Sequence, residues 1–399
     1  MRQVRSLLAA TLAMLCAGIQ NPAPGTAGHD AKQEQSSAAR FAYGGNAAEI
    51  PAEFLENLVL VPVEINKSQP SLFLLDSTAS VSSVSPARAA ELGLRDLRDV
   101  VLSFPGIDVP FTSLTTLEKP HFSTATGRSY QGTLGADFLG RVVVEIDYSR
   151  QTLRLYDPRT YKASDKAAPL ALRFVGGMPV VSARLSLPRQ KAHESDFVID
   201  TSQDESLVIS ERFAEAHRLF SSHLKTANVF DPALEDGASV ALGRLIDFQI
   251  GGYQVRSPLA AFVGQNLRVA ADSHSAGVIG GGLLRRFTVT FDYAHQRIFL
   301  SANKHFEDYE QEDKSGIAVV AKGPGLRTFE VVAVQPGSPG ADAGVQKGDV
   351  IAGIDEEAAA DLTLASIRSL FRQGGHKYKL LIDRNGQEVQ VNVQMRRLI

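Results

Sequence analysis

The feature of this sequence that most constrains its fold is a repeated segment. At positions 72–80 the chain reads LFLLDSTAS, and at positions 197–203 it reads FVIDTSQ. Each is an apolar, β-type run that ends in an aspartate followed by hydroxyl residues. The closing elements repeat as well, since EIDYSRQTLRLY at 145–156 matches TFDYAHQRIFL at 290–300. Repetition of this kind predicts a β-rich unit that is used twice in one chain.

The two aspartates of the repeat, Asp76 and Asp200, indicate a pair of catalytic carboxylates. The simpler alternative is that Asp76 begins a turn, where Asp, Ser and Thr are common. In a duplicated unit, however, both aspartates reach equivalent positions beside a pseudo-two-fold axis. Two carboxylates about 3 Å apart share one proton, so that one acts as a base on water and the other polarises a peptide carbonyl. We expect Ser77 and Thr201 to hydrogen-bond across this axis and hold the loops rigid.

Several segments of the chain resemble those of bacterial retropepsin-like aspartic peptidases. LFLLDSTAS precedes VSPARAAELGL, FVIDTSQ precedes LVISERFAEAH, and TLGADFL and VIGGGLL resemble the apolar-Gly segments that support each catalytic loop in that family. The resemblance covers roughly residues 55–303. It implies a mainly β fold of two tandem retropepsin-like β-barrel lobes, which form a pepsin-like pseudo-dimer. It also implies Asp76 and Asp200 as the catalytic residues, with Ser77 and Thr201 as supports.

The chain departs from the family at one position in each motif. The family's motif is Asp-Thr/Ser-Gly, whereas this chain has Thr78 and Ser202 in place of the glycines. A glycine there lets the substrate backbone pass close to the carboxylates, so we expect the Thr78 side chain to intrude on the cleft, and Ser202 to intrude less. Two functions therefore stay open: an aspartic-type endopeptidase, and a catalytically inactive pseudo-peptidase that binds peptides or acts as a scaffold. No sequence feature supports a third, a ligand carrier on the same scaffold.

The C-terminal part of the chain has a different character. VQPGSPGADAGVQKGDVIAGID, at 334–355, resembles an α+β PDZ domain of the bacterial type. Such domains bind an extended peptide as an added strand at an open sheet edge. The resemblance implies that the N–H groups of Ser315, Gly316 and Ile317 meet the carboxylate of a C-terminal peptide, beside a helix around 363–371. The alternative is a packing module that binds no free peptide.

The N-terminal residues predict export. A basic MRQVR precedes the apolar SLLAATLAMLCAGI, which is the pattern of a signal peptide and is too short for a stable membrane span. We expect a signal peptide over 1–27, with cleavage near Ala27 or alternatively near Gly18, and a periplasmic or secreted protein. Modification of Cys16 as a lipoprotein is a further alternative, which the bulky Leu15 before it disfavours. If cleavage removes Cys16, the mature chain has no cysteine for a disulfide or a thiolate.

Composition excludes several other classes of function. The formal net charge is −3, and the absence of a basic excess argues against a nucleic-acid partner. The nine histidines include no H-E-x-x-H pattern, and no G-x-G-x-x-G spacing is present, so we expect neither a metal nor a cofactor. The expected partners are a peptide or protein substrate and a peptide at the PDZ domain.

Changes in composition along the chain predict its boundaries. Ala, Gly, Ser, Gln and Pro are common before the first β-type run, which predicts a flexible tether. The acidic stretch HFEDYEQEDKS at 305–315 predicts an exposed linker, because so many charges resist packing into a core. The expected segments are the tether at 28–50, the first lobe at 51–160, the second lobe at 168–303, the acidic linker at 304–315 and the PDZ domain at 314–399.

Overall fold

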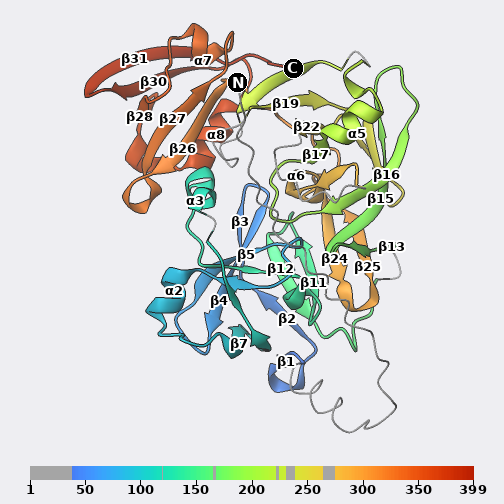
Figure 1. Ribbon diagram of the computed structural model, residues 1–399. Coiled ribbons are helices and arrows are strands. Elements are labelled where there is room, and N and C mark those ends of the chain that lie inside the picture. Colours follow the sequence, from blue (N-terminus) through green and yellow to red (C-terminus); the bar gives the residue numbers. More distant parts are fainter. Residues whose placement is uncertain (1–37, 119, 165–167, 222–223, 231–238, 264–274) are drawn as a thin grey trace, which may run out of the picture. The chain divides into compact units, whose positions relative to one another are not determined.

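The computed structural model describes residues 38–118, 120–164, 168–221, 224–230, 239–263 and 275–399 (Figure 1). Residues from Ala38 to Ile399 belong to one compact unit. The predicted signal peptide and the first part of the predicted tether lie outside the described residues. Among the helices within those ranges, none is long and apolar enough to cross a membrane.

The first lobe is built on a nine-stranded sheet with the order β1-β8-β7-β4-β5-β10-β6-β9, and β3 pairs with β4. The helices α2, α3 and α4 interrupt its strands. Ser85 caps α2 as its sequence suggests, because the Ser85 side chain accepts from Arg88 N and proline occupies the first turn. The bounds are β1 Arg40–Phe41, β3 Glu53–Leu55, β4 Leu58–Ile65, β5 Ser71–Leu75, β6 Ser83–Val84, α2 Pro86–Glu91, β7 Arg98–Phe104, β8 Ile107–Ser113, β9 Thr115–Thr116, α3 Pro120–Thr126, β10 Gly132–Leu134 and α4 Ala136–Leu139.

The second lobe is built on a ten-stranded sheet with the order β18-β19-β22-β17-β23-β16-β15-β20-β21, and β14 pairs with β15. The second half of β15 alternates between buried and exposed residues, which is the pattern of a strand with one face in the core, whereas β22 and β23 are buried throughout. The bounds are β14 Arg173–Val175, β15 Met178–Ser186, β16 His193–Ile199, β17 Leu207–Ser210, α5 Glu211–Ala216, β18 Thr226–Phe230, β19 Ser239–Arg244, β20 Asp247–Ile250, β21 Tyr253–Arg256, β22 Leu259–Val263, β23 Gly277–Ile279 and α6 Gly281–Leu284.

The strand pairing confirms the duplication. In the first lobe β10 lies parallel to β5 and antiparallel to β6, and β6 lies parallel to β9. In the second lobe β23 is parallel to β16 and antiparallel to β17, and β17 is parallel to β22. The lobes differ in the hairpin β18–β19, which stands between α5 and β20; within the described ranges the first lobe goes from α2 directly to β7.

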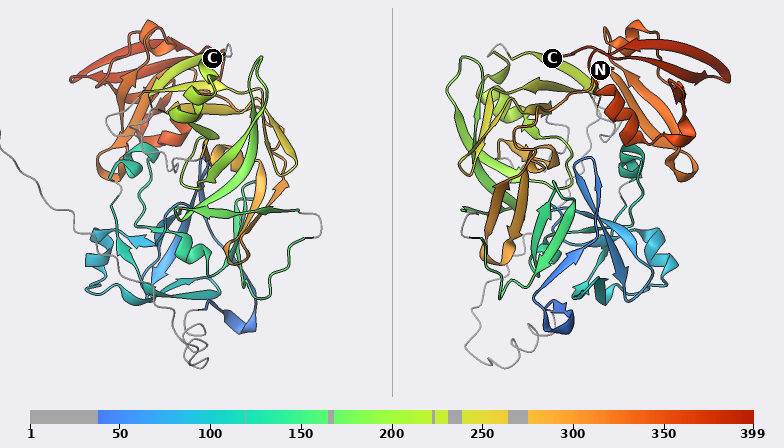
Figure 2. Two further views of the ribbon diagram at one scale, coloured as in Figure 1. Left: turned by 45° about the vertical axis from the view of Figure 1, so that its right-hand side comes forward. Right: turned by 180° about the vertical axis from the view of Figure 1, so that it is seen from behind.

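A third sheet joins the two halves of the repeat, with the order β13-β25-β24-β11-β12-β2. The matching hairpins meet side by side, since β11 and β24 are antiparallel, with Val144 opposite Phe291. Figure 2 shows the orange strands β24 and β25 beside the green strands β11 and β12. The bounds are β2 Ala47–Ile50, β11 Val143–Asp147, β12 Thr152–Tyr156, β13 Pro169–Ala171, β24 Phe287–Asp292 and β25 Arg297–Ala302.

The end of the predicted tether is part of this joint sheet. Residues 47–50 form β2, which pairs with β12 so that Ile50 lies opposite Leu153. Ile50 is only 1% exposed. The prediction of a flexible tether that extends to residue 50 is therefore wrong at its end, because four residues of it add a strand to the sheet and bury an isoleucine.

The C-terminal domain has its own sheet and its own core. Its sheet has the order β26-β27-β28-β30-β31, β29 pairs with β28, and α7 and α8 complete it. The hairpin β30–β31 turns at Asn385 and Gly386, which have the positive φ angles that an Asn-Gly turn requires. The bounds are β26 Ile317–Lys322, β27 Thr328–Val334, α7 Pro339–Asp342, β28 Val350–Ile354, β29 Glu357–Ala358, α8 Leu364–Phe371, β30 Lys377–Arg384 and β31 Gln387–Gln394.

The acidic stretch before this domain is not the exposed linker that its charge predicts. Glu312 is 2% exposed and pairs with Arg244 of β19 at 2.7 Å. Glu310 accepts a hydrogen bond from Leu259 N at 3.1 Å, and burial raises its pKa. Arg286 donates to the main-chain oxygens of Phe306 and Asp308. The prediction is therefore wrong from Glu310 onward, because the second lobe supplies partners for Glu310 and Glu312, whereas the earlier acidic residues Glu307 and Asp308 are exposed.

Candidate active site

Each predicted catalytic aspartate directly follows the strand that the repeat assigns to it. Asp76 follows β5, and its N–H donates to Leu134 O at 3.0 Å; Asp200 follows β16, and its N–H donates to Ile279 O at 2.9 Å. The two side chains therefore start from equivalent points of the two lobes. Asp76 is 3% exposed and Asp200 is 9% exposed. Buried carboxylates of this kind require hydrogen-bonding partners.

A reciprocal set of hydrogen bonds joins the two aspartate loops. Ser77 N donates to Thr201 Oγ1 at 3.0 Å, and Thr201 N donates to Ser77 Oγ at 3.1 Å. Each hydroxyl then donates across the axis to the last main-chain oxygen of the other lobe's strand, Ser77 to Ile199 O at 2.8 Å and Thr201 to Leu75 O at 2.7 Å. Ser77 and Thr201 are completely buried. These four bonds fix the two loops against each other.

The hydroxyl groups at the glycine positions of the motif turn back onto the aspartates. Asp76 Oδ1 accepts from Thr78 N at 3.0 Å, from Thr78 Oγ1 at 2.7 Å and from Ala79 N at 3.0 Å. Asp200 Oδ1 accepts from Ser202 N and Ser202 Oγ, both at 2.8 Å. The side chains that were expected to intrude on the cleft thus become additional donors to one oxygen of each carboxylate.

Two glycines of the supporting segments are required by close packing behind the loops. A Cβ at Gly135 would lie 2.6 Å from Ala79 O, and a Cβ at Gly280 would collide with Glu205 O. Ser82 strengthens the first of these contacts, because its hydroxyl accepts from Gly135 N and donates to Asp137. The apolar-Gly segments therefore hold the aspartate loops by direct backbone contact.

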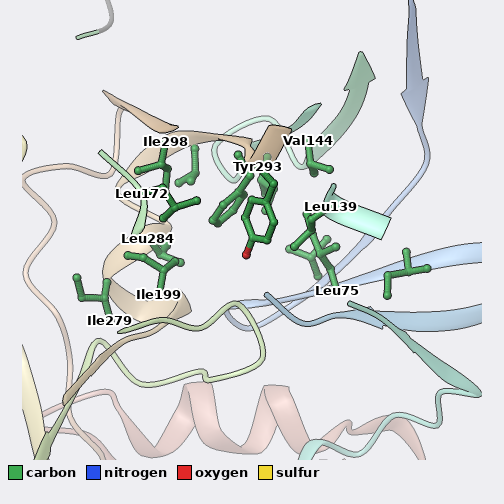
Figure 3. Packing of buried hydrophobic residues seen from close by; sticks show 14 of the residues in the cluster. Leu75, Leu139, Val144, Leu172, Ile199, Ile279, Leu284, Tyr293 and Ile298 are labelled. Carbon is green, nitrogen blue, oxygen red and sulfur yellow. The ribbon is translucent and has the colours of Figure 1, made fainter. Parts of the chain in front are cut away.

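Tyr293 belongs to this site, although the sequence assigned it no role. Its hydroxyl donates to Ser77 O at 3.1 Å. Burial raises the pKa of the Tyr293 hydroxyl well above the ordinary value, and the negative charges of the nearby Asp76 and Asp200 add to this shift. Figure 3 shows the hydroxyl between Leu75 and Ile199. The available signal was the Asp-Tyr pair that both halves contain, but a match between halves indicates duplication and not a role.

Tyr148, the matching residue of the first half, makes different contacts from those of Tyr293. It stacks edge-on against Phe54. Its hydroxyl is buried and has no hydrogen-bond partner among the described residues, and burial raises its pKa. The pseudo-symmetry of the site is therefore broken at the tyrosines: Tyr293 of the second half bonds to an aspartate loop, and Tyr148 does not.

A cavity of about 820 Å³ begins beside the second aspartate loop. It is bounded by the turn between β3 and β4, by the loop after Asp200, by the acidic stretch and by the groove between β26 and α8. Its lining includes Glu56, Asn57, Phe122, Ser202, Gln203, Asp204, Glu205, Glu310, Asp313, Gly316, Ile317, Ala318, Val319, Arg368 and Arg372.

Polar contacts from the β3–β4 turn connect the walls of this cavity. Glu56 forms ion pairs with Arg368 of α8 and with Arg372, the residue that follows α8, each at 3.0 Å. The neighbouring Asn57 donates to Asp204 O at 2.6 Å. Arg368 also donates to Ala125 O at the end of α3. One turn of the first lobe therefore touches both the C-terminal domain and the loop after Asp200.

The loop predicted to bind a peptide carboxylate already holds a carboxylate of the chain. Asp313 Oδ1 accepts from Ser315 N at 2.9 Å, from Ser315 Oγ at 2.9 Å and from Gly316 N at 2.7 Å. Ile317 N donates to Ser315 Oγ at 2.9 Å. Burial raises the pKa of Asp313, although these bonds oppose the shift. Sequence reasoning treated Asp313 only as part of an acidic run and missed this position.

Comparison with known proteins assigns the C-terminal domain. A family model described as a PDZ domain matches residues 330–384. No curated protein matches the chain. The structural neighbours include the aspartic proteinase from Irpex lacteus, at 12% identity over 66% of this chain and 98% of that chain, with a TM-score of 0.42. Basic 7S globulin from soybean shows 12% identity over 66% of this chain and 97% of that one, with a TM-score of 0.40.

A further neighbour is a photosystem II D1 C-terminal processing protease. It shares 20% identity over 22% of this chain and 24% of that chain, with a TM-score of 0.20. Similarities at these levels carry no argument about function. The pepsin-like arrangement is instead defined by the paired lobes of this chain, their joint sheet and the reciprocal bonds of Ser77 and Thr201. The molecule thus combines an aspartic-peptidase-like fold with a C-terminal PDZ domain.

Proposed function

We propose that the chain is an aspartic-type endopeptidase in which Asp76 and Asp200 hydrolyse peptide bonds. The observation that carries this proposal is the reciprocal network of Ser77 and Thr201, which holds the two buried aspartate loops together. The groups of this network are buried, and a buried polar network is stable only when each of its donors and acceptors is hydrogen-bonded. The network therefore holds the two loops in one fixed arrangement, as a pair of catalytic carboxylates requires. Cleavage of an unfolded protein such as casein across acidic to neutral pH tests the activity directly.

In this mechanism the two carboxylates share one proton. The ionised carboxylate removes a proton from water as the water attacks the peptide carbonyl, and the protonated one gives its proton to the carbonyl oxygen, which forms a tetrahedral diol. The first carboxyl group then gives its proton to the peptide nitrogen as the C–N bond breaks. The second carboxylate takes a proton from the diol, so that the pair again holds one proton. Donors on Oδ1 of each aspartate fix the orientation of both carboxylates. Tyr293 holds the main chain of Ser77 and so positions the first loop.

The second candidate is a pseudo-peptidase that binds peptides without cleaving them. Its support is the pair of hydroxyl residues at the glycine positions, Thr78 and Ser202, each bonded to its own aspartate. A hydrogen bond donated to a carboxylate favours the ionised form. Extra donors on both aspartates therefore oppose the sharing of a proton on which the mechanism depends.

The double variant Thr78→Gly with Ser202→Gly distinguishes these candidates. It removes both hydroxyl donors and opens space beside the carboxylates, so we expect cleavage to increase. Loss of donors to the ionised forms favours protonation of the aspartates, so the pH profile should move upward. The measurement is the casein cleavage rate from pH 3 to pH 7. A rate and profile equal to those of the unsubstituted chain would show that the hydroxyls have no such effect.

We also propose export, with the signal peptide at residues 1–27 and a periplasmic or secreted mature protein. The support is the basic segment followed by a short apolar run at the N-terminus. The mature chain is expected to begin near residue 28. N-terminal sequencing of the protein recovered from periplasm or medium measures this directly, and an intact chain that stays in the cytoplasm would contradict it.

The PDZ domain is proposed to bind a peptide of the substrate or of a partner. The support is β26, which stands at the edge of its sheet and pairs with β27. An edge strand offers main-chain donors and acceptors to an added strand. The cavity connects this edge with Ser202, two residues after Asp200, so a polypeptide on β26 could continue toward the second aspartate loop.

A further inference from the structure

The loop before β26 has its main-chain donors engaged by the chain itself. Two consecutive N–H groups, those of Ser315 and Gly316, donate to Asp313 Oδ1, and the next one, of Ile317, donates to the Ser315 hydroxyl. These are the three groups that the resemblance to PDZ domains assigns to the terminal carboxylate of a ligand. A carboxylate entering this loop would have to displace Asp313 and would meet its negative charge at close range.

The cations beside the loop are engaged as well. Lys314 donates to Gln311 Oε1 and to Arg372 O, both at 2.7 Å. Arg372 pairs with Glu56 at 3.0 Å. Burial alone would lower the pKa of Arg372, but the negative charge of Glu56 and its hydrogen bond raise the pKa above the ordinary value. Glu56 therefore compensates the charge of Arg372. Neither cation is thus available to compensate the charge of an incoming terminal carboxylate without giving up its present partner.

The space around the loop continues past it. The cavity is lined by residues 316–319 and also by Asp313, Ser202 and Gln203. At the opposite end of the groove a Cβ at Gly127 would lie 2.9 Å from Leu364 Cβ, so the first lobe covers the end of the groove near Leu364. The helix α3 of the first lobe also packs against β26. The residues of β26 that line the cavity are 317–319, its first half, from which a bound chain can continue past Asp313 toward the second aspartate loop.

We infer that the PDZ groove accepts an internal, extended segment of a polypeptide, and that Asp313 stands where a ligand's terminal carboxylate would otherwise bind. This inference rests on the proposed peptide binding and specifies its ligand. Recognition then comes from the main chain of β26 and not from a free C-terminus. It also suits an endopeptidase, because a segment that ended at the loop could not extend to the aspartates.

The test compares peptides that differ only at their C-terminus. A pool of random peptides of about ten residues is prepared in two isotopically distinguishable forms, with a free C-terminal acid and with a C-terminal amide. The full chain carrying Asp76→Asn, which prevents cleavage, is immobilised, and the retained peptides are measured by mass spectrometry. We expect acid and amide forms to be retained equally, within twofold. In the additional variant Asp313→Ala the loop's N–H groups become available, so acids should exceed amides by about tenfold.

Two further variants control the result. Asp313→Asn keeps an oxygen that accepts from the same N–H groups, so its acid-to-amide ratio should stay near one. Asp355→Ala removes an aspartate of the same domain that accepts from Lys379 N outside the loop, and should leave the ratio unchanged. Preferential retention of acids with Asp313 in place would overturn the inference alone. A ratio that stays near one in a folded Asp313→Ala chain would also overturn it, whereas retention of no peptide in either form would remove the proposed peptide binding itself.

Discussion

Replacement of Asp76 by asparagine is expected to lower the rate of peptide-bond cleavage by at least about a thousandfold. An amide has nearly the size and shape of the carboxyl group, and its oxygen can still accept from Thr78 and Ala79 as the carboxylate does. It can neither carry the shared proton nor remove a proton from water. The measurement is the initial rate of casein cleavage by equal amounts of purified Asp76→Asn and unsubstituted chain. The same loss is expected for Asp200→Asn.

The matched control is Asp99→Asn, which makes the same chemical change at an exposed position of β7. It should retain the full rate, and all three variants should keep the thermal unfolding midpoint within a few degrees. Cleavage that persists in Asp76→Asn would mean that another group performs the reaction. If the unsubstituted chain itself cleaves nothing at any pH tested, the pseudo-peptidase becomes the better account.

The second large effect is expected on stability, from Thr201→Val. Valine keeps the branched shape of threonine but removes its hydroxyl, which leaves Ser77 N without an acceptor and Leu75 O without a donor. Both groups are buried, and each unsatisfied group costs about 1–3 kcal/mol. The free energy of unfolding should therefore fall by roughly 3 kcal/mol. Urea unfolding followed by circular dichroism measures this change.

Thr226→Val provides the control for this measurement. Thr226 is exposed on β18, where a valine is also a good strand residue, so the free energy of unfolding should change by less than about 0.5 kcal/mol. An equally small change in Thr201→Val would show that water or rearranged neighbours replace the crossing bonds. The rigid link between the two aspartate loops would then not exist in solution.

The duplicated fold was predictable because its signals are local and occur twice. An apolar run that ends in Asp76 and another that ends in Asp200 fix two equivalent strands, and the matching Asp-Tyr turns fix the hairpins after them. The hydroxyl residues that follow the aspartates were assigned to cross the axis from the same pattern. The PDZ domain was predictable from its Gly-rich turns and its Asn-Gly hairpin, since these residues permit few backbone conformations.

The unpredicted features depend on partners that are distant in the sequence. The acidic stretch was expected to be exposed because its own charges resist burial, and nothing local indicates that Arg244 neutralises Glu312. Tyr293 reaches Ser77 across 216 positions of sequence. Asp313 accepts its hydrogen bonds from residues close to it in the sequence. Its position beside the predicted peptide-binding loop, however, becomes evident only from the cavity that this loop lines.

The joint sheet explains what the protein gains from having both halves in one chain. Each half ends in a hairpin, and the pairing of β11 with β24 means that the first strand of each hairpin has its second edge hydrogen-bonded by the other half. Two separate halves would have to find each other in solution, so their assembly would weaken on dilution. Within one chain the halves are held at a constant, high effective concentration, and assembly of the paired aspartates becomes independent of how much protein is present.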